Sequence, residues 1–304
     1  MASESLRPFL PPIGNPGPRG PDLKDVPPRI PTGVPDFDFL TGGVPAGSVV
    51  LLLGEAGAGH QEFALTSAVH LMLRYDDPKL HRFYLGSARG PFVYPDGISY
   101  VSTSRSREEV MDELRGSFAG LWPEVLDRHL TFFDLSANYF RDSVVPSSWA
   151  SLPGPLLSPA PPRPQGADGP LHALTSALEA SGRKNLVVVD SLTDLIVREG
   201  IPSGDLLALL KGLRRKAKEW DGLVYLLLTE GVAPAAIQHA VIDSVDGVLQ
   251  FRWTTTPNQS HRQRSMLMPK FMPLLSRLPP EHQGRFIIRV NAASGLVTTQ
   301  YERV

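Results

Sequence analysis

The chain has 304 residues, of which 42% are hydrophobic and 20% are charged, and this composition is typical of a globular protein of one or two domains. The formal net charge of −1 argues against a globally basic nucleic-acid-binding protein and against a strongly acidic surface. The absence of cysteine excludes disulfides, thiolate zinc sites and a cysteine nucleophile.

The sequence also lacks the signals of membrane insertion and secretion. No apolar run reaches the roughly 18 to 20 residues of a membrane helix, and the N-terminus lacks a charged start followed by an apolar stretch. We therefore expect no membrane association and a cytoplasmic location.

Prolines gather in two parts of the chain. Nine of the 30 prolines lie within residues 1–31, and eight lie within 146–170. Because proline lacks the N–H and fixes φ, such stretches form neither helices nor sheet ladders. We predict a disordered or extended tail over 1–28 and a Pro-rich insertion over 141–169 within one domain spanning 29–304. A partner that reads polyproline conformation is the alternative to a solvated tail and loop.

The remaining sequence alternates apolar strands with helices. In chain order, the predicted strands lie at 48–53, 97–103, 129–134, 185–190 and 223–229, with four more near 247–253, 264–270, 285–290 and 296–301. The predicted helices between them lie at 60–74, 106–118, 169–181, 203–220 and 233–245. Continuous apolar strands between helices indicate a parallel sheet covered on both faces. The predicted class is α/β, with a mostly parallel central sheet flanked by helices and an antiparallel C-terminal β extension.

The turn between the first predicted strand and its helix has the frame of a phosphate loop, G-x-x-x-x-G-K-[ST]. Its residues are Gly54, Glu55, Ala56, Gly57, Ala58, Gly59, His60 and Gln61. Such a loop aims backbone N–H groups at phosphate oxygens at the positive end of a helix. His60 stands where the lysine is expected and Gln61 where the Mg²⁺-binding hydroxyl is expected, so only the backbone half of the motif is kept.

A second motif is the segment NLVVVDSLTDL, in which four apolar residues lead to Asp190. This pattern is typical of a Walker B strand, whose aspartate reaches the magnesium shell. The alternative is a strand-end aspartate that caps the following loop.

The opening segment RIPTGVPDFDFLTGGVPAGSVVLLLGEAGAG (29–59) resembles the signature of KaiC-like proteins of the RecA superfamily, of archaeal type. The matching positions are Thr32, Gly33, Asp38, Leu40, Gly42, Gly43 and Gly47. VVVDSLTDL, VYLLLTE (224–230), VDGVLQF (245–251) and MLMPKF (266–271) resemble later segments of the same family. The resemblance covers about residues 29–300 and implies a RecA-like fold, with subunits that pack side by side and bind nucleotide between them.

The sequence departs from this family at the positions that perform hydrolysis. Besides His60 and Gln61, Ser104 and Arg105 stand where the resemblance implies a pair of glutamates. In the late hairpin, Lys270 is kept but Met272 stands at the position of an arginine that would reach the neighbour's nucleotide. A hydroxyl and a guanidinium are poor general bases near pH 7, so these changes together argue against hydrolysis.

Two basic segments are candidate nucleic-acid contacts. Lys211, Arg214, Arg215 and Lys218 fall on one helical face, for which a solvated amphipathic surface is the favoured interpretation. The hairpin tip 252–264 combines arginines with Trp253 and is the better candidate for a phosphate-backbone contact, with an ordinary exposed hairpin as the favoured alternative. Arg105 and Arg107 are candidates for an anion or subunit contact, or for surface ion pairs.

The sequence thus predicts a catalytically degenerate RecA-fold protein with a regulatory or scaffolding role. We expect weak binding of ATP or ADP through the loop, with Asp190 and Lys270 nearby, without hydrolysis and without a secure Mg²⁺ or other metal site. The expected partner is a second copy or an intact RecA-like relative. The alternatives are a slow ATPase in which His60 and Lys270 replace the missing lysine, and a nucleic-acid-binding RecA relative, which is not favoured.

Overall fold

A computed structural model describes residues 28–86, 92–120, 122–141, 143–146, 149–150, 169–255, 262–276, 278 and 285–302. The predicted tail therefore lies outside the described residues except for Pro28, as do residues 151–168 of the predicted Pro-rich insertion. In the described ranges, no helix has both the length and the apolar character needed to cross a membrane.

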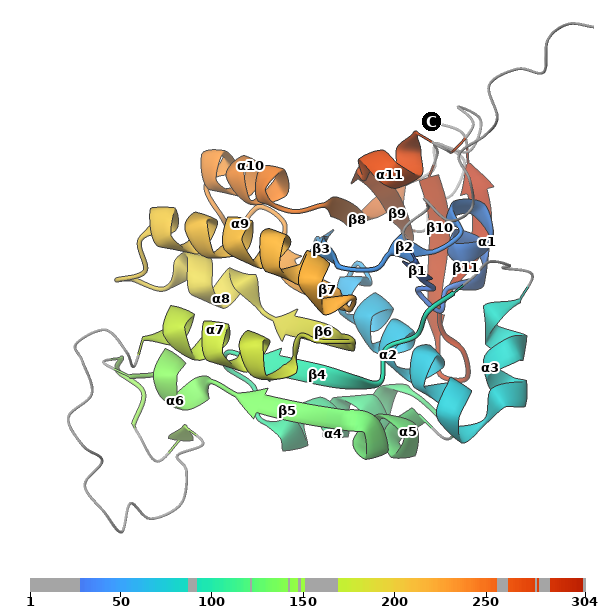
Figure 1. Cartoon of the computed structure of the whole chain (residues 1–304), viewed down its shortest axis with the longest axis horizontal. Helices are drawn as coiled ribbons and strands as arrows, with labels where there is room; N and C mark the ends of the chain where they lie inside the picture. The colour runs from blue at the N-terminus through green and yellow to red at the C-terminus, as the bar shows by residue number, and fades with distance from the viewer. Residues whose placement is uncertain are drawn as a thin grey trace, which may run out of the picture.

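A twisted sheet forms the centre of the described molecule (Figure 1). Its strand order is β11-β10-β9-β8-β3-β7-β6-β4-β5. The strands span β3 (Ser48–Gly54), β4 (Gly97–Ser102), β5 (Leu130–Asp134), β6 (Asn185–Asp190), β7 (Leu223–Thr229), β8 (Gly247–Thr255), β9 (Arg262–Lys270), β10 (Arg285–Asn291) and β11 (Gly295–Glu302). The strands from β5 to β8 in this order pair in parallel, and β9, β10 and β11 add antiparallel pairs at one edge. The predicted fold class is therefore confirmed.

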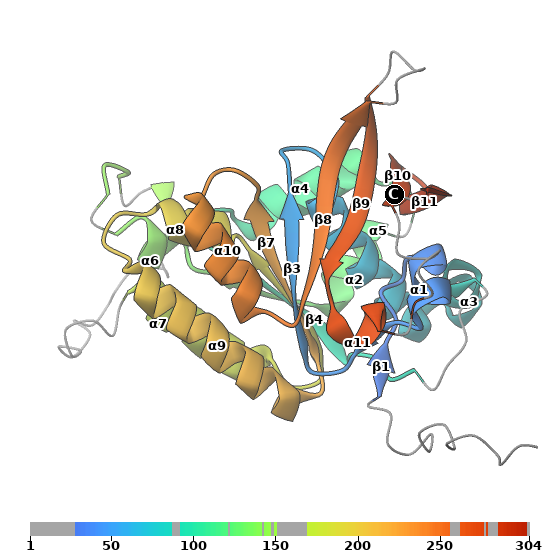
Figure 2. The ribbon, with the colours of Figure 1, turned by 90° about the horizontal axis from the view of Figure 1, so that it is seen from above.

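Helices cover both faces of the parallel strands (Figure 2). One face packs against α2 (His60–Asp76), α4 (Arg107–Ser117) and α5 (Trp122–His129), and the other packs against α7 (Pro170–Ser181), α8 (Leu192–Val197), α9 (Ser203–Trp220) and α10 (Ala235–Ser244). Successive side chains of β3 alternate between the two cores: Val50 and Leu52 join the first, while Val49, Leu51 and Leu53 join the second. Burial on both faces explains why this strand has a continuous apolar sequence.

Smaller elements complete the domain. The sequence pattern did not predict the helices α1 (Pro35–Thr41), α3 (Pro78–Leu85), α6 (Ser136–Tyr139) and α11 (Met272–Leu275), nor α5 and α8. It also did not predict the two-stranded pair β1 (Arg29–Ile30) with β2 (Val44–Pro45). They are short segments, for which sequence periodicity gives little signal. A capping box begins α4, because the Ser106 side chain accepts from Glu109 N–H and the Glu109 carboxylate accepts from Ser106 N–H.

The glycine-rich opening of the domain is held by a buried carboxylate. Asp38 accepts hydrogen bonds from the N–H and hydroxyl of Thr32, at 2.7 and 2.9 Å, and from the N–H of Gly33, at 2.8 Å. Gly33 has φ 77°, and its carbonyl lies 2.6 Å from Nδ1 of His70 on α2. Thr32, Gly33 and Asp38, three positions of the family resemblance, thus hold the opening segment against α2.

We predict that Asp38→Asn destabilises the fold by about 2 kcal/mol, because the amide group must turn its NH₂ towards an N–H donor and leave that buried donor unpaired. Chemical denaturation of both proteins measures the change. Asp36→Asn is the matched control, since Asp36 lies in the same helix but is exposed, and a change within about 0.5 kcal/mol is expected there. Equal stability of the two variants would contradict the role given to Asp38.

Candidate nucleotide site

The loop predicted to bind phosphate joins the end of β3 to the start of α2. Gly54 pairs with Thr229 of β7 and Phe251 of β8, so the loop leaves the middle of the sheet at the carboxyl ends of parallel strands. Gly57 and Gly59 have φ values of 70° and 116°, which favour glycine. Among the described residues, the N–H groups of Gly57, Gly59 and His60 donate to no acceptor. The glycine conformations and the free N–H groups expected of a phosphate-binding loop are therefore present.

Strand β8 fixes this loop from one side. Glu55 N–H donates to Phe251 O at 3.0 Å, and the Glu55 carboxylate accepts from Trp253 N–H at 3.2 Å. The Trp253 indole N–H donates to Ala56 O at 3.1 Å, and Ala58 is fully buried. These contacts hold the loop in its shape. The sequence placed Trp253 at a hairpin tip and gave no signal that its ring covers the loop, because the contact spans 197 residues.

The His60 side chain folds back onto the strand that precedes the loop. A Cβ atom placed on Gly54 would lie 2.2 Å from His60 Nδ1, so only glycine at position 54 leaves room for the ring. This Nδ1 is buried and has no hydrogen-bond partner among the residues that the structure describes. Burial lowers the pKa of His60 to about 4, so the imidazole is neutral at pH 7. His60 therefore supplies no positive charge to a phosphate at that pH.

A chain of polar contacts links the loop to the predicted Walker B aspartate. The Gln61 amide donates to Glu113 at 3.3 Å, and Glu113 pairs with the guanidinium of Arg105. Arg105 Nη1 lies 3.4 Å from the Asp190 carboxylate, which also accepts from the Tyr100 hydroxyl at 2.5 Å. Burial raises the pKa of Asp190, and the Tyr100 hydrogen bond and the Arg105 charge act against that shift. The structure thus brings Gln61, Arg105 and Asp190 together.

These residues do not fit a magnesium ion. Mg²⁺ binds carboxylate, hydroxyl and water oxygens in an octahedral arrangement. Here the Tyr100 hydroxyl and the Arg105 guanidinium both contact Asp190 Oδ2, so a metal ion at this carboxylate would face the fixed positive charge of Arg105. Gln61 presents its amide NH₂ to Glu113 rather than an oxygen to the loop. In the described ranges, no cluster of three His, Asp or Glu side chains could hold a metal.

The two residues at the expected glutamate positions are both bound within the chain. Ser104 donates to the Asp194 carboxylate at 2.8 Å, and Thr103 donates to the same carboxylate. Arg105 pairs with Asp190 and Glu113, as described above. A hydroxyl and a guanidinium so placed give no general base for a water molecule. Arg107 forms an exposed ion pair with Asp127 at 2.5 Å, which supports the surface interpretation of that side chain.

Lys270 does not join this site within the chain. It pairs with Val248 at the start of β8, whereas Gly54 pairs with Phe251 farther along the same strand. The Lys270 ammonium donates to the carbonyls of Ile242 and Asp243, at 2.8 and 2.9 Å, at the C-terminal end of α10. Within one chain the structure does not bring His60 and Lys270 together, because His60 follows the carboxyl end of β3 whereas Lys270 lies beside the amino end of β8. A contact of Lys270 with a neighbouring subunit stays a prediction.

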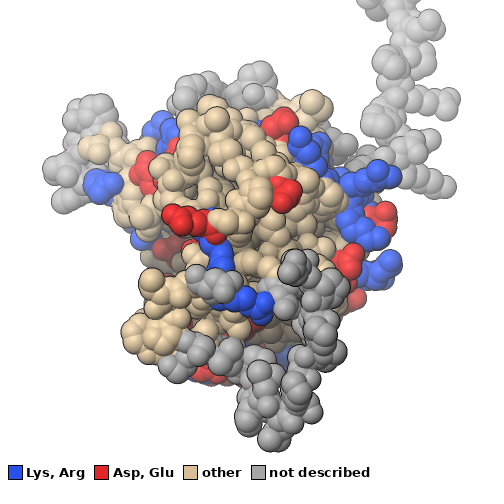
Figure 3. All heavy atoms as spheres, turned by 90° about the vertical axis from the view of Figure 1, so that its left-hand side faces the viewer, with Lys and Arg blue, Asp and Glu red and all other residues tan. Residues whose placement is uncertain are grey.

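Most charges of the two basic segments have acidic partners. On α9, Arg214 and Lys218 both pair with Asp246, at 3.1 and 3.0 Å. Figure 3 shows one side of the molecule, where basic side chains have acidic side chains among them. This arrangement agrees with the solvated-face interpretation of α9.

The described part of the late hairpin shows the same pairing. Arg252 pairs with Glu230 at 2.5 Å, and Arg264 lies 3.7 Å from Glu62. Arg262 and Arg264 lie over the Trp253 ring, with distances of 4.9 and 5.1 Å to its centre. The tip itself, residues 256–261, lies outside the described residues.

Two solved structures share this architecture. The KaiC-like protein PH0186 from the hyperthermophilic archaeon Pyrococcus horikoshii OT3 has a TM-score of 0.58 and 17% identity, over 90% of this chain and 99% of that chain. The flagellar accessory protein FlaH from Methanocaldococcus jannaschii has a TM-score of 0.56 and 15% identity, over 90% and 98%. No family model and no curated protein matches the sequence.

The protein therefore belongs to the class of chains with a RecA-like α/β fold. Within that class, its architecture is that of the KaiC-like structures, as the opening motif predicted. At these levels of identity the likeness establishes the fold, while the chemistry depends on the residues described above.

The buried imidazole of His60 makes a testable contribution to stability. The folded pKa of about 4 lies below the ordinary value of 6.5, so the unfolded chain binds the proton more tightly and stability falls as the pH drops below about 6.5. We predict that wild type loses about 2 kcal/mol more than His60→Gln between pH 7 and pH 5, measured by urea unfolding.

His239→Gln is the matched control for this measurement, because the His239 side chain is exposed on α10. The control variant should keep the pH dependence of wild type. Parallel stability curves for wild type and His60→Gln would show that the His60 imidazole is accessible to protons in the folded chain.

Proposed function

We propose that this protein is a RecA-fold subunit that does not hydrolyse ATP and acts in regulation or as a scaffold. One observation carries the proposal: the Arg105 guanidinium faces the Asp190 carboxylate and also pairs with Glu113. A buried or half-buried carboxylate that already has a cationic partner is a poor ligand for a second cation. The Arg105 guanidinium thus provides the positive charge beside Asp190 that a metal ion would provide in an ATPase of this fold.

Weak nucleotide binding fits the same site. The loop keeps unpaired N–H groups and glycine conformations that suit a phosphate group at the start of α2. The neutral His60 and the engaged Gln61 add no charge and no hydroxyl to that cradle. We therefore propose that ATP or ADP binds through backbone groups, with little dependence on Mg²⁺, in the cytoplasm.

We predict that ATP turnover equals a buffer blank at neutral pH and that a fluorescent ATP analogue binds with similar affinity in Mg²⁺ and in EDTA. The reason is that the groups that clamp phosphate, bind the metal and orient water are replaced, and the loss of one such group in a P-loop enzyme costs about 10³-fold or more in rate. Phosphate release and fluorescence anisotropy are the measurements.

Two variants sharpen this test. His60→Lys with Gln61→Thr restores the phosphate-loop side chains and should tighten nucleotide binding by at least tenfold, because a lysine adds charge-assisted hydrogen bonds. Asp190→Asn should leave the blank rate unchanged. Turnover in wild type that Asp190→Asn abolishes would establish the slow ATPase instead, and an unchanged affinity in the double variant would mean that the loop does not accept phosphate.

Assembly is the second part of the proposal. Since the fold is kept while the hydrolytic positions differ, we propose that surface recognition is the function, with a second copy or an intact RecA-like relative as the partner. Met272 is 80% exposed, two residues after the strand that ends in Lys270, and an apolar side chain of that exposure suits a contact surface. Arg105 and Lys270 are bound within the chain, so charge changes there would also disturb the fold.

We predict a dimer or higher oligomer at tens of micromolar, measured by light scattering or sedimentation. Met272→Glu should shift it towards monomer, because it places an unpaired charge in an apolar contact. Phe83→Glu on α3, where the side chain is also exposed, is the matched control and should leave the mass unchanged. A single monomeric species, alone and mixed with candidate relatives, would contradict this part of the proposal.

A further inference from the structure

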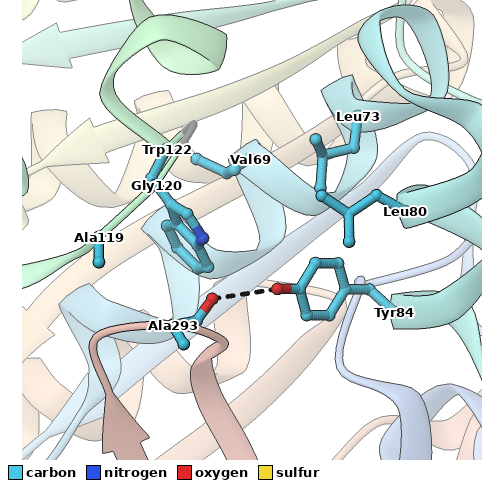
Figure 4. Close-up of a pocket in the computed structure, with 8 residues that line it drawn as sticks. All are labelled: Val69, Leu73, Leu80, Tyr84, Ala119, Gly120, Trp122 and Ala293. Carbon is cyan, nitrogen blue, oxygen red and sulfur yellow. Dashed lines mark hydrogen bonds between the residues drawn. The ribbon is translucent and has the colours of Figure 1, made fainter.

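A mostly apolar cavity of about 200 Å³ lies beside the middle of α2, away from the candidate nucleotide site (Figure 4). Val69 and Leu73 of α2 form its buried floor, and Leu80 and Tyr84 of α3 and Trp122 of α5 form its walls. Exposed small residues of the 119–120 turn and of the β10–β11 turn line its opening. None of the described residues that line it carries a charge. The cavity is therefore open to a small uncharged molecule.

One hydrogen-bond donor in this cavity has no partner. Trp122 is 4% exposed, and its ring packs between Phe118, stacked at 4.6 Å, and His70, edge to face at 5.2 Å. Within the described part of the chain, its indole N–H donates to no acceptor. Figure 4 shows the indole nitrogen on the side of the ring that faces Leu80 and Tyr84. The indole nitrogen is accessible at the surface of the cavity and is not sealed in the core, so this N–H offers one donor to an acceptor inside the cavity.

The opposite wall is fixed in position. The Tyr84 hydroxyl donates to Ala293 O at 3.0 Å, across the opening of the cavity. The Tyr84 ring stacks on His70 with 4.0 Å between ring centres. Both aromatic walls, Tyr84 and Trp122, thus rest on the same buried imidazole and define a space with little freedom to collapse. A preformed space of this kind accepts a ligand without a large ordering cost.

We propose that this cavity binds a small aromatic molecule that carries one uncharged hydrogen-bond acceptor. The size sets the class, because an apolar cavity of about 150 Å³ accommodates benzene, so 200 Å³ accommodates a single ring with a short substituent. The chemistry sets the acceptor, since an indole N–H can only donate. The proposal does not rest on nucleotide binding or on assembly, since none of its residues belongs to those sites.

Acetophenone and α-methylstyrene form a suitable probe pair, because they have the same shape and only the first has a carbonyl acceptor. The indole N–H resonance of Trp122 is assigned in ¹⁵N-labelled protein by its loss in Trp122→Phe. Titration with acetophenone should move this resonance downfield, with a Kd on the order of 1 mM. α-Methylstyrene should bind about fivefold more weakly, because one neutral hydrogen bond is missing.

Two variants test whether the probes bind inside this cavity and through the indole N–H. In Trp122→Phe, followed through the backbone amides of α2 and α3, the two probes should bind equally. Ala119→Trp should block the exposed opening and abolish binding of both, while Ala236→Trp, at an exposed position of α10, should bind like wild type. An unmoved Trp122 resonance at 10 mM of either probe, equal affinities in wild type, or binding that persists in Ala119→Trp would overturn the proposal and leave water as the partner of the indole.

Discussion

The buried strand β3 fixes the position of every group in the candidate nucleotide site. Its side chains enter two separate cores, so the strand cannot shift or rotate without exposing apolar surface on one face. Its last residue, Gly54, is therefore held beside the ends of β7 and β8, and the loop must turn there into α2. The carboxyl end of β6, with Asp190, comes to the same edge because all these strands run in parallel.

The charged side chains at the carboxyl ends of these strands pair with one another. Asp190 sits at a strand end in a half-buried environment, where an isolated carboxylate would be unfavourable. A metal ion is one way to compensate such a charge, and an arginine is another. Arg105 takes the second course, with Glu113 and Gln61 completing the contacts up to the loop. The charge of Asp190 is therefore compensated within the chain.

The parts of the opening motif have different physical roles. Thr32, Gly33 and Asp38 form a buried hydrogen-bonded turn that docks on α2 through His70, and these positions hold the chain together. His60 and Gln61 follow the loop: the imidazole packs against Gly54 and Phe251, and the Gln61 amide donates to Glu113. Asp38 accepts three buried hydrogen bonds, so substitution there breaks several buried contacts at once.

The sequence by itself determined the α/β class, the order of the long strands and helices and the phosphate-loop frame, because these follow from local periodicity and from glycine spacing. Only the tertiary structure decided that Arg105 contacts Asp190, 85 residues away, and that Trp253 covers the loop. It also decided that Lys270 binds the end of α10, near the amino ends of the parallel strands. Such pairings depend on which strands become neighbours and on which way each strand end faces. That information lies in the packing of the whole sheet and in no single segment of the sequence.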